Sequence, residues 1–344
     1  MNHVGAMESL GLDGLASARE RPFFRRVPFL LAFRRSGVPQ HILKRRSVTM
    51  LENPADFQEN DQERRTLSVG RASWHAISRG EFETVRQLAG GPWKEQLDGI
   101  ELPWLCWHVD EQWSLVQQRM VSAAGWTPVV GNDPRAGRPP LIDGAVYVDF
   151  NDGLGLPALS MLFPLEFVYL FSSRLAFWHS DLLIREPMFF QLAEEFRALQ
   201  DGATAAVDGR KRWYRNLLGK RGRYWELIGC TTRGASRDQY KNACGWWRHQ
   251  HLHPNCTTDS SKRVRQRYTI DHGAGILVWE EQHGGVVHTL PSRPLEEGHC
   301  TRIGNKRYTP LSPNDWRRDL SKDLSFNYDI REVCSRLGLT KYLF

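Results

Sequence analysis

Three polar residues interrupt an apolar stretch in the middle of the chain. His179, Ser180 and Asp181 follow the apolar run that ends at Trp178, and apolar residues then resume. On an extended chain His179 and Asp181 share one face because they are two positions apart. Polar groups beside a buried strand cost free energy unless they are paired or bind something. Imidazole and carboxylate both ligate divalent cations, so the pattern predicts a metal site. A strand-end turn in which Asp181 caps the next segment is the alternative.

A second histidine, late in the chain, is a candidate to complete such a site. His299 lies between Gly298 and Cys300 in a glycine-flanked stretch. We expect this loop to bring His299 to Asp181. The metal ligands predicted from the sequence are therefore Asp181, His179 and His299.

A segment rich in tryptophan and histidine, residues 244–256, holds further candidates. Its three alternating histidines and two cysteines lack the paired spacing of a structural zinc site. Aromatic faces can stack on a sugar or a base, although buried packing is the alternative for both tryptophans. We assign Trp246, Trp247 and His249 to substrate contact.

The stretch 210–223 is strongly basic. Such side chains suit phosphate oxygens, to which they donate charge-assisted hydrogen bonds. The same composition fits the backbone of a nucleic acid or an ordinary solvated surface. The candidates for the phosphate role are Arg210, Arg212, Arg215 and Lys220. The sequence contains neither a GxxxxGK[ST] loop nor GxSxG or HExxH, and no GxGxxG follows a strand.

The elements that must position these residues alternate between strand and helix. An apolar strand at 102–109, a helix at 111–124 that begins after Asp110, and a strand at 127–130 form a βαβ pattern typical of a parallel sheet. Further strands are predicted at 145–150, 166–171, 175–177, 224–230 and 276–280. Further helices are predicted at 71–98, 156–163, 186–200 and 330–343. The pattern predicts an α/β fold, with a mostly parallel central sheet flanked by helices.

Length and composition set the expected organisation. The chain has 344 residues and a net charge of +7, which favours anionic partners. We expect an N-terminal extension and linker at 1–70, a helical lead-in at 71–99 and an α/β domain of catalytic type at 100–344. Within the extension, the basic and apolar segment 21–46 is a candidate for peripheral contact with a membrane.

The sequence carries no secretion signal and no apolar run of about 20 residues, the length that spans a bilayer. Its six cysteines are scattered and form no CxxC pair, which is typical of reduced thiols. We therefore expect a cytoplasmic protein, with membrane contact limited to the segment 21–46.

Residues 168–184, VYLFSSRLAFWHSDLLI, resemble the strand-turn-strand around the metal-binding Asp-x-Asp motif of nucleotide-sugar glycosyltransferases of the GT-A fold. Asp181 matches the second acid of that motif, and His179 takes the place of the first. The stretch 270–281, followed by His299, is similar to the late strand and the C-terminal histidine that complete the metal site in some members. Residues 224–256 resemble the segment that faces the acceptor.

This resemblance implies transfer of a sugar from a nucleoside-diphosphate donor to a hydroxyl acceptor. It implies a divalent metal, Mn²⁺ or Mg²⁺, at Asp181, His179 and His299, and the basic residues of 210–223 over the diphosphate. Asp238 or Glu226 would act as the base toward the acceptor in an inverting enzyme. Two other classes stay open: a non-catalytic binding or scaffold protein on the same fold, and a basic, metal-dependent protein that acts on nucleic acid.

Overall fold

The computed structural model describes residues 79–133, 136–154, 161–209, 221–246, 268, 272–300 and 329–344. All of them belong to one compact unit that spans residues 50–344. The expected extension 1–70, with its segment 21–46, lies outside the described residues. No helix in the described part of the chain is long and apolar enough to cross a membrane.

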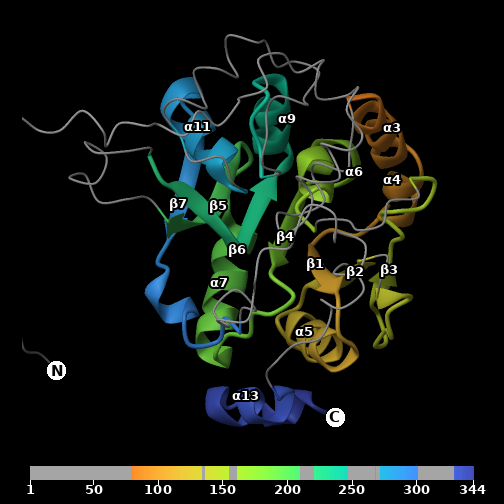
Figure 1. The fold of residues 1–344 in the computed structure, drawn as a ribbon, viewed down its shortest axis with the longest axis vertical. Helices are drawn as coiled ribbons and strands as arrows, with labels where there is room; N and C mark the ends of the chain where they lie inside the picture. Colours follow the sequence, from red (N-terminus) through yellow and green to blue (C-terminus); the bar gives the residue numbers. More distant parts are fainter. Residues whose placement is uncertain are drawn as a thin grey trace, which may run out of the picture. The chain divides into compact units, whose positions relative to one another are not determined.

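A seven-stranded sheet forms the centre, in the order β3-β2-β1-β4-β6-β5-β7 (Figure 1). Neighbouring strands are parallel except where β6 pairs with β4 and β5. The strands are β1 (Pro103–His108), β2 (Thr127–Asn132), β3 (Val146–Tyr147), β4 (Arg174–Trp178), β5 (Ala203–Gly209), β6 (Arg223–Thr232) and β7 (Val286–Leu290). The predicted α/β class with a mostly parallel sheet is confirmed.

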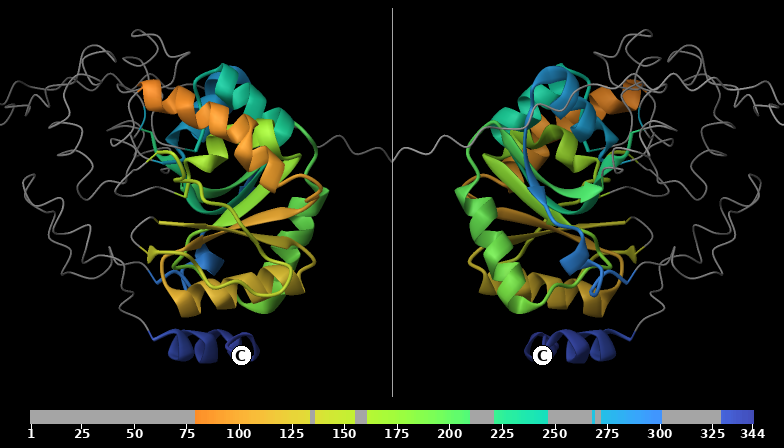
Figure 2. Two further views of the ribbon diagram at one scale, coloured as in Figure 1. Left: turned by 90° about the vertical axis from the view of Figure 1, so that its right-hand side faces the viewer. Right: turned by 90° about the vertical axis from the view of Figure 1, so that its left-hand side faces the viewer.

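Helices cover both faces of this sheet (Figure 2). One face packs on α3 (Arg79–Gly90), α4 (Pro92–Gln96), α6 (Val168–Phe171), α9 (Arg233–Lys241) and α11 (Ala274–His283). The other packs on α5 (Glu111–Ala123), α7 (Glu186–Ala198) and α13 (Ile330–Leu337). Leu105 and Trp107 of β1 enter the first core, and Trp104 and Cys106 enter the second. A strand covered on both faces reads as a continuous apolar run, which is why β1 is visible in the sequence.

The βαβ unit predicted from the sequence is present. Asp110 caps α5 by accepting hydrogen bonds from the amides of Gln112 and Trp113. Gly125 follows the helix with a positive φ of 72°, the left-handed conformation that glycine adopts most readily. β1 and β2 then pair in parallel, from Pro103 opposite Thr127 onward.

Two predicted strands are helical instead. Residues 166–171 lie in a short 3-10 helix (Pro164–Phe167) and in α6, and residues 276–280 lie inside α11. Most residues of both segments are buried. A buried helix is apolar on all sides, so its sequence cannot be told from that of a buried strand by periodicity.

Other elements gave little signal. The sequence does not predict β5, β7 or α9. β5 is rich in alanine, which is depleted in strands, and α9 is mostly polar. The C-terminal helix is confirmed over Ile330–Leu337, followed by a 3-10 turn at Thr340–Tyr342. Of the predicted helix 156–163, residues 156–160 lie outside the described part of the chain, and residues 161–163 form a turn instead of a helix. The five cysteines within that part are free and buried.

Candidate metal centre

The candidate site follows β4, at the point where the order of the sheet reverses. The chain runs outward from β1 to β2 and β3, and β4 then returns to the other side of β1. Cys106 of β1 lies opposite Trp178, the last residue of β4, in a parallel pair. Ligands of open α/β sheets bind outside the carboxyl ends of the strands at such a switch point.

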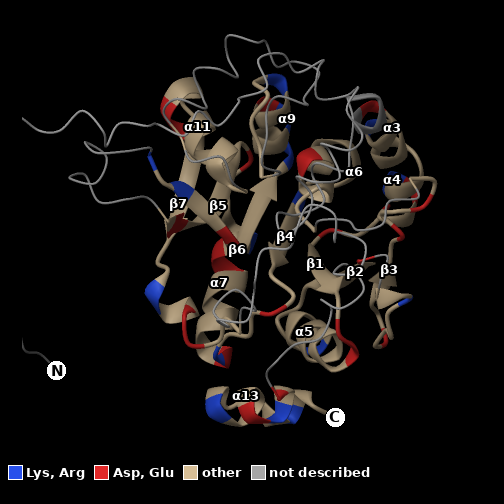
Figure 3. Cartoon of the chain, viewed as in Figure 1, with Lys and Arg blue, Asp and Glu red and all other residues tan. Residues whose placement is uncertain are grey.

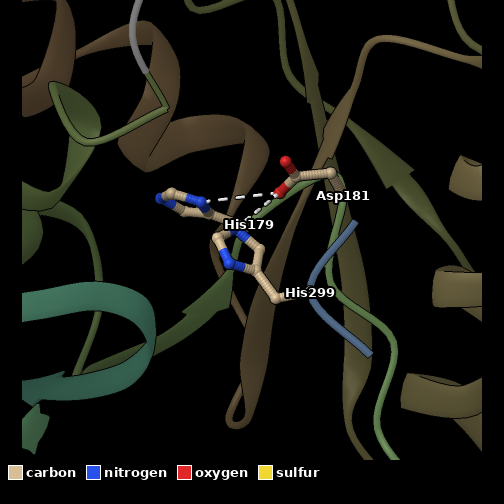
Figure 4. Close-up of side chains that lie close together, drawn as sticks. All are labelled: His179, Asp181 and His299. Atoms are coloured by element: carbon tan, nitrogen blue, oxygen red, sulfur yellow. Dashed lines mark ion pairs between the residues drawn. The ribbon is translucent and has the colours of Figure 1, made fainter. Parts of the chain in front are cut away.

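Three ionisable side chains meet there (Figure 4). His179 Nδ1 lies 3.5 Å from Asp181 Oδ1, and His299 Nε2 lies 3.5 Å from the same oxygen. The potential ligand atoms of the three residues all lie within 4.8 Å of one another. The side chains of His179, Asp181 and His299 are 25%, 15% and 22% exposed, respectively, so the cluster is sheltered but still in contact with solvent.

Backbone hydrogen bonds explain how His299, which follows β7 along the chain, reaches the end of β4. Leu182 and His299 form an isolated antiparallel bridge. The Cys300 amide donates to the Asp181 carbonyl at 2.9 Å, and the Leu183 amide donates to the Gly298 carbonyl at 3.0 Å. The bridge therefore fixes the backbone of both ligand segments side by side.

Gly298 allows this close approach. A Cβ at this position would collide with the carbonyl oxygen of Leu183 and would come within 3.2 Å of Leu337 Cδ1. Glycine permits a second backbone to approach where any side chain would separate the two. The glycine noted beside His299 in the sequence thus has a steric reason.

The charges of the cluster support one another. Burial would raise the pKa of Asp181, but hydrogen bonds from His179 and His299 outweigh it and hold that pKa well below its usual range. Burial would lower the pKa of His179, yet the hydrogen bond and the charge of Asp181 raise it, and Glu226 adds to the increase. Asp181 is therefore an anion at neutral pH, as a cation ligand must be.

Glu226, one of the two predicted bases, lies close enough to act electrostatically on His179. The pairing of β6 with β5 shifts register between Gly229 and Trp225, so the residues between them have no partner on β5. The Leu227 carbonyl in this bulge accepts a hydrogen bond of 2.8 Å from the His179 amide. Bulges often re-aim side chains beside functional sites. The Glu226 carboxylate is paired with Arg223.

Asp238, the other predicted base, is engaged elsewhere. Its carboxylate accepts hydrogen bonds from Trp279 Nε1 at 2.7 Å and from Asn242 Nδ2 at 3.2 Å. Asp238 lies on α9. The first residue of this helix, Arg233, donates its backbone amide hydrogen bond to the carbonyl of Ser173, which directly precedes β4. That is the opposite end of β4 from His179.

Trp246 lies in the core rather than on a surface. Its side chain is fully buried, its Nε1 donates to Thr231 Oγ1 at 2.7 Å, and its ring meets Phe177 edge to face at 4.8 Å. The other predicted substrate and phosphate residues, Trp247, His249, Arg210, Arg212, Arg215 and Lys220, lie outside the described residues.

Two buried polar residues, one on β1 and one on α5, are not among the residues predicted from the sequence. His108 ends β1 and is only 4% exposed, and its Nδ1 has no hydrogen-bond partner within the described part of the chain. Gln117 of α5 is fully buried and donates to the carbonyls of His179 and Leu182. Both are polar residues within apolar patterns, and that interruption is the signal that could have identified them.

Searches against protein-family models, curated proteins and solved structures gave no match to this chain. The fold and the cluster define it as an α/β protein with two histidines and one aspartate at the switch point of its sheet.

Proposed function

We propose that this protein is a metal-assisted glycosyltransferase that moves a sugar from a nucleoside-diphosphate donor to a hydroxyl acceptor. The observation that carries the proposal is the cluster of His179, Asp181 and His299 directly after β4. Its position, on a mostly parallel sheet between two helical layers, supports a fold of the GT-A type.

The residues of the cluster fit a divalent metal. Two imidazoles and an ionised carboxylate form a donor set suited to Mn²⁺ and other first-row cations. His179, Asp181 and His299 would hold the ion. When bound, it would stabilise the negative charge that develops on the departing diphosphate.

Of the two predicted bases, we assign the role to Glu226. It lies beside the cluster and accepts a hydrogen bond from Arg223. A carboxylate of this kind would take the proton from the acceptor hydroxyl. Asp238 contacts Trp279 instead. The proposal also includes three expectations from the sequence. Basic residues of 210–223 cover the diphosphate, the protein resides in the cytoplasm, and the segment 21–46 contacts a membrane.

The charge distribution favours this proposal over action on nucleic acid. Basic and acidic residues are mixed along α5 and α13, whereas α9 carries three basic residues and one acidic residue (Figure 3). Binding to a phosphate backbone is favoured by basic residues gathered on one face. The mixed pattern of α5 and α13 is not of that kind.

The test is a thermal-unfolding panel of UDP-, GDP-, CMP- and dTDP-sugars, each with and without Mn²⁺. A ligand that binds only the folded state raises the melting temperature by mass action. We expect one nucleotide class to stabilise the protein, more strongly with Mn²⁺, and Asp181→Asn to remove the metal effect. No shift with any donor would contradict the transferase proposal. It would favour a binding protein or, if an oligonucleotide then bound, a nucleic-acid-acting protein.

A further inference from the structure

We propose that Gln117 is a positioning residue that holds the turn carrying His179 and Asp181 in the geometry a metal needs. This inference rests on the metal site of the proposed function. Gln117 itself is not a ligand and acts only through the backbone of the turn.

The amide of Gln117 bridges the two ends of this turn. Its Nε2 donates to the carbonyl of His179 at 2.8 Å and to the carbonyl of Leu182 at 2.9 Å. The Leu182 amide also donates to the His179 carbonyl, at 3.2 Å, and closes the turn. Asp181 lies between these two anchored carbonyls, so the direction of its side chain depends on them.

The turn is held from three directions. The bulge of β6 binds the His179 amide through the Leu227 carbonyl, and the segment around His299 binds the backbone of Asp181 through Cys300. Gln117 of α5, on the second face of the sheet, provides the third restraint through its hydrogen bonds to the His179 and Leu182 carbonyls. Without it, the remaining bonds would still attach the turn to β6 and to His299, but the His179 and Leu182 carbonyls would lose this restraint.

The chemistry of the position supports this role. Gln117 is completely buried on the side of α5 that also buries Val116, Met120 and Val121. An apolar residue would pack there without the cost of removing an amide from water. Both N–H groups of Gln117 donate to the turn, whereas its buried Oε1 has no hydrogen-bond partner within the described part of the chain. The two donated bonds are therefore what offsets the cost of burying this amide.

The next residue provides a matched control. Gln118 is also fully buried on α5, and its Nε2 donates to Ser114 Oγ at 3.0 Å and to the Pro140 carbonyl at 2.9 Å. Its Oε1 accepts from the Ile142 amide at 3.0 Å. Gln118 thus restrains a different loop. The two glutamines share burial, helix and chemistry, and they differ in what they hold.

The experiment measures Mn²⁺ binding by electron paramagnetic resonance in the wild-type chain, Gln117→Met and Gln118→Met. Methionine keeps the length of the side chain and removes its donors. Partners that orient metal ligands typically change metal affinity by about 10- to 100-fold when removed. We expect a loss of that size for Gln117→Met and an unchanged Kd for Gln118→Met. Both variants should lose thermal stability.

A second readout separates positioning from general damage. Co²⁺ bound at the site gives a visible absorption band that reports ligand geometry, and this band should change in Gln117→Met alone. Equal Mn²⁺ affinity and an identical Co²⁺ band in Gln117→Met and the wild type would overturn the inference while leaving the metal site intact. A wild-type chain that binds no Mn²⁺ would overturn both. If Gln117→Met does not fold, Gln117→Leu carries the same expectations.

Discussion

Leu182 and His299 face each other across an antiparallel bridge, and this single backbone pairing brings the late histidine to Asp181. The two ligand segments come from distant parts of the chain. Their meeting depends on a few hydrogen bonds rather than on a long ladder. Small changes of the bridge should therefore affect the site more than they affect the fold.

Gly298→Ala is the sharpest test of the bridge. The added methyl would collide with the Leu183 carbonyl oxygen. Overpacking of this kind typically costs about 1–3 kcal/mol. We expect a lower free energy of unfolding and weaker Mn²⁺ binding, measured by urea unfolding and by metal titration.

Gly90→Ala is the control, because a Cβ at Gly90 meets nothing within 4 Å. It should leave both quantities close to those of the wild type. Full metal affinity in Gly298→Ala would show that the close approach of the two segments is not needed for binding.

The sequence predicted the fold class and three residues that do lie together, but not how they come together. His179 and Asp181 were visible because they interrupt an apolar run. The pairing of His299 with Leu182 is a tertiary contact that no local pattern encodes. The helices at 164–171 and 274–283 read as strands because burial on all sides removes the helical period. Gln117 was missed because its role depends on a turn that lies far along the chain.

The ligand set predicts metal preference. Imidazole favours first-row transition cations, whereas Mg²⁺ prefers oxygen ligands. We expect Mn²⁺, Co²⁺ and Zn²⁺ to raise the melting temperature at concentrations where Mg²⁺ has no effect. The comparison needs equal free-ion concentrations and equal ionic strength. Stabilisation by Mg²⁺ equal to that by Mn²⁺ would argue against the two histidines as ligands.

The assignment of Glu226 as base predicts a contrast with Asp238. Removing a general base typically costs about 10²–10⁴ in rate. Glu226→Gln should therefore lose transfer while still binding Mn²⁺ with the wild-type Kd. Asp238→Asn weakens the contact with Trp279, so we expect it to lower the melting temperature and to spare kcat. The reverse pattern, with kcat lost in Asp238→Asn alone, would transfer the role to Asp238.

The C-terminal segment should contribute stability that depends on pH. Glu186 accepts hydrogen bonds from Lys341 at 2.5 Å and from the Tyr342 hydroxyl at 2.7 Å, and these lower its pKa. A lowered carboxylate pKa adds stability above the unfolded value of about 4.3, which is lost as the pH falls through the folded value.

Glu186→Gln should therefore destabilise the protein by ~1 kcal/mol or less at pH 7, because the pair is partly exposed. The difference from the wild type should shrink as the pH falls below the unfolded value of about 4.3 and through the lowered folded value, because the carboxylate becomes protonated in both states. Urea unfolding at pH 7 and over a series of acidic pH values measures it. A difference that persists unchanged at low pH would mean that ionisation of Glu186 contributes nothing.

The most direct test of the metal centre is a Mn²⁺ titration of the wild-type chain and of Asp181→Asn, followed by electron paramagnetic resonance at pH 7.5. Asparagine keeps the shape of the side chain and removes the charge that faces both imidazoles. We predict one bound ion per wild-type chain and loss of that binding in a folded Asp181→Asn. Equal binding by both chains, or none by the wild type, would contradict a metal centre at His179, Asp181 and His299.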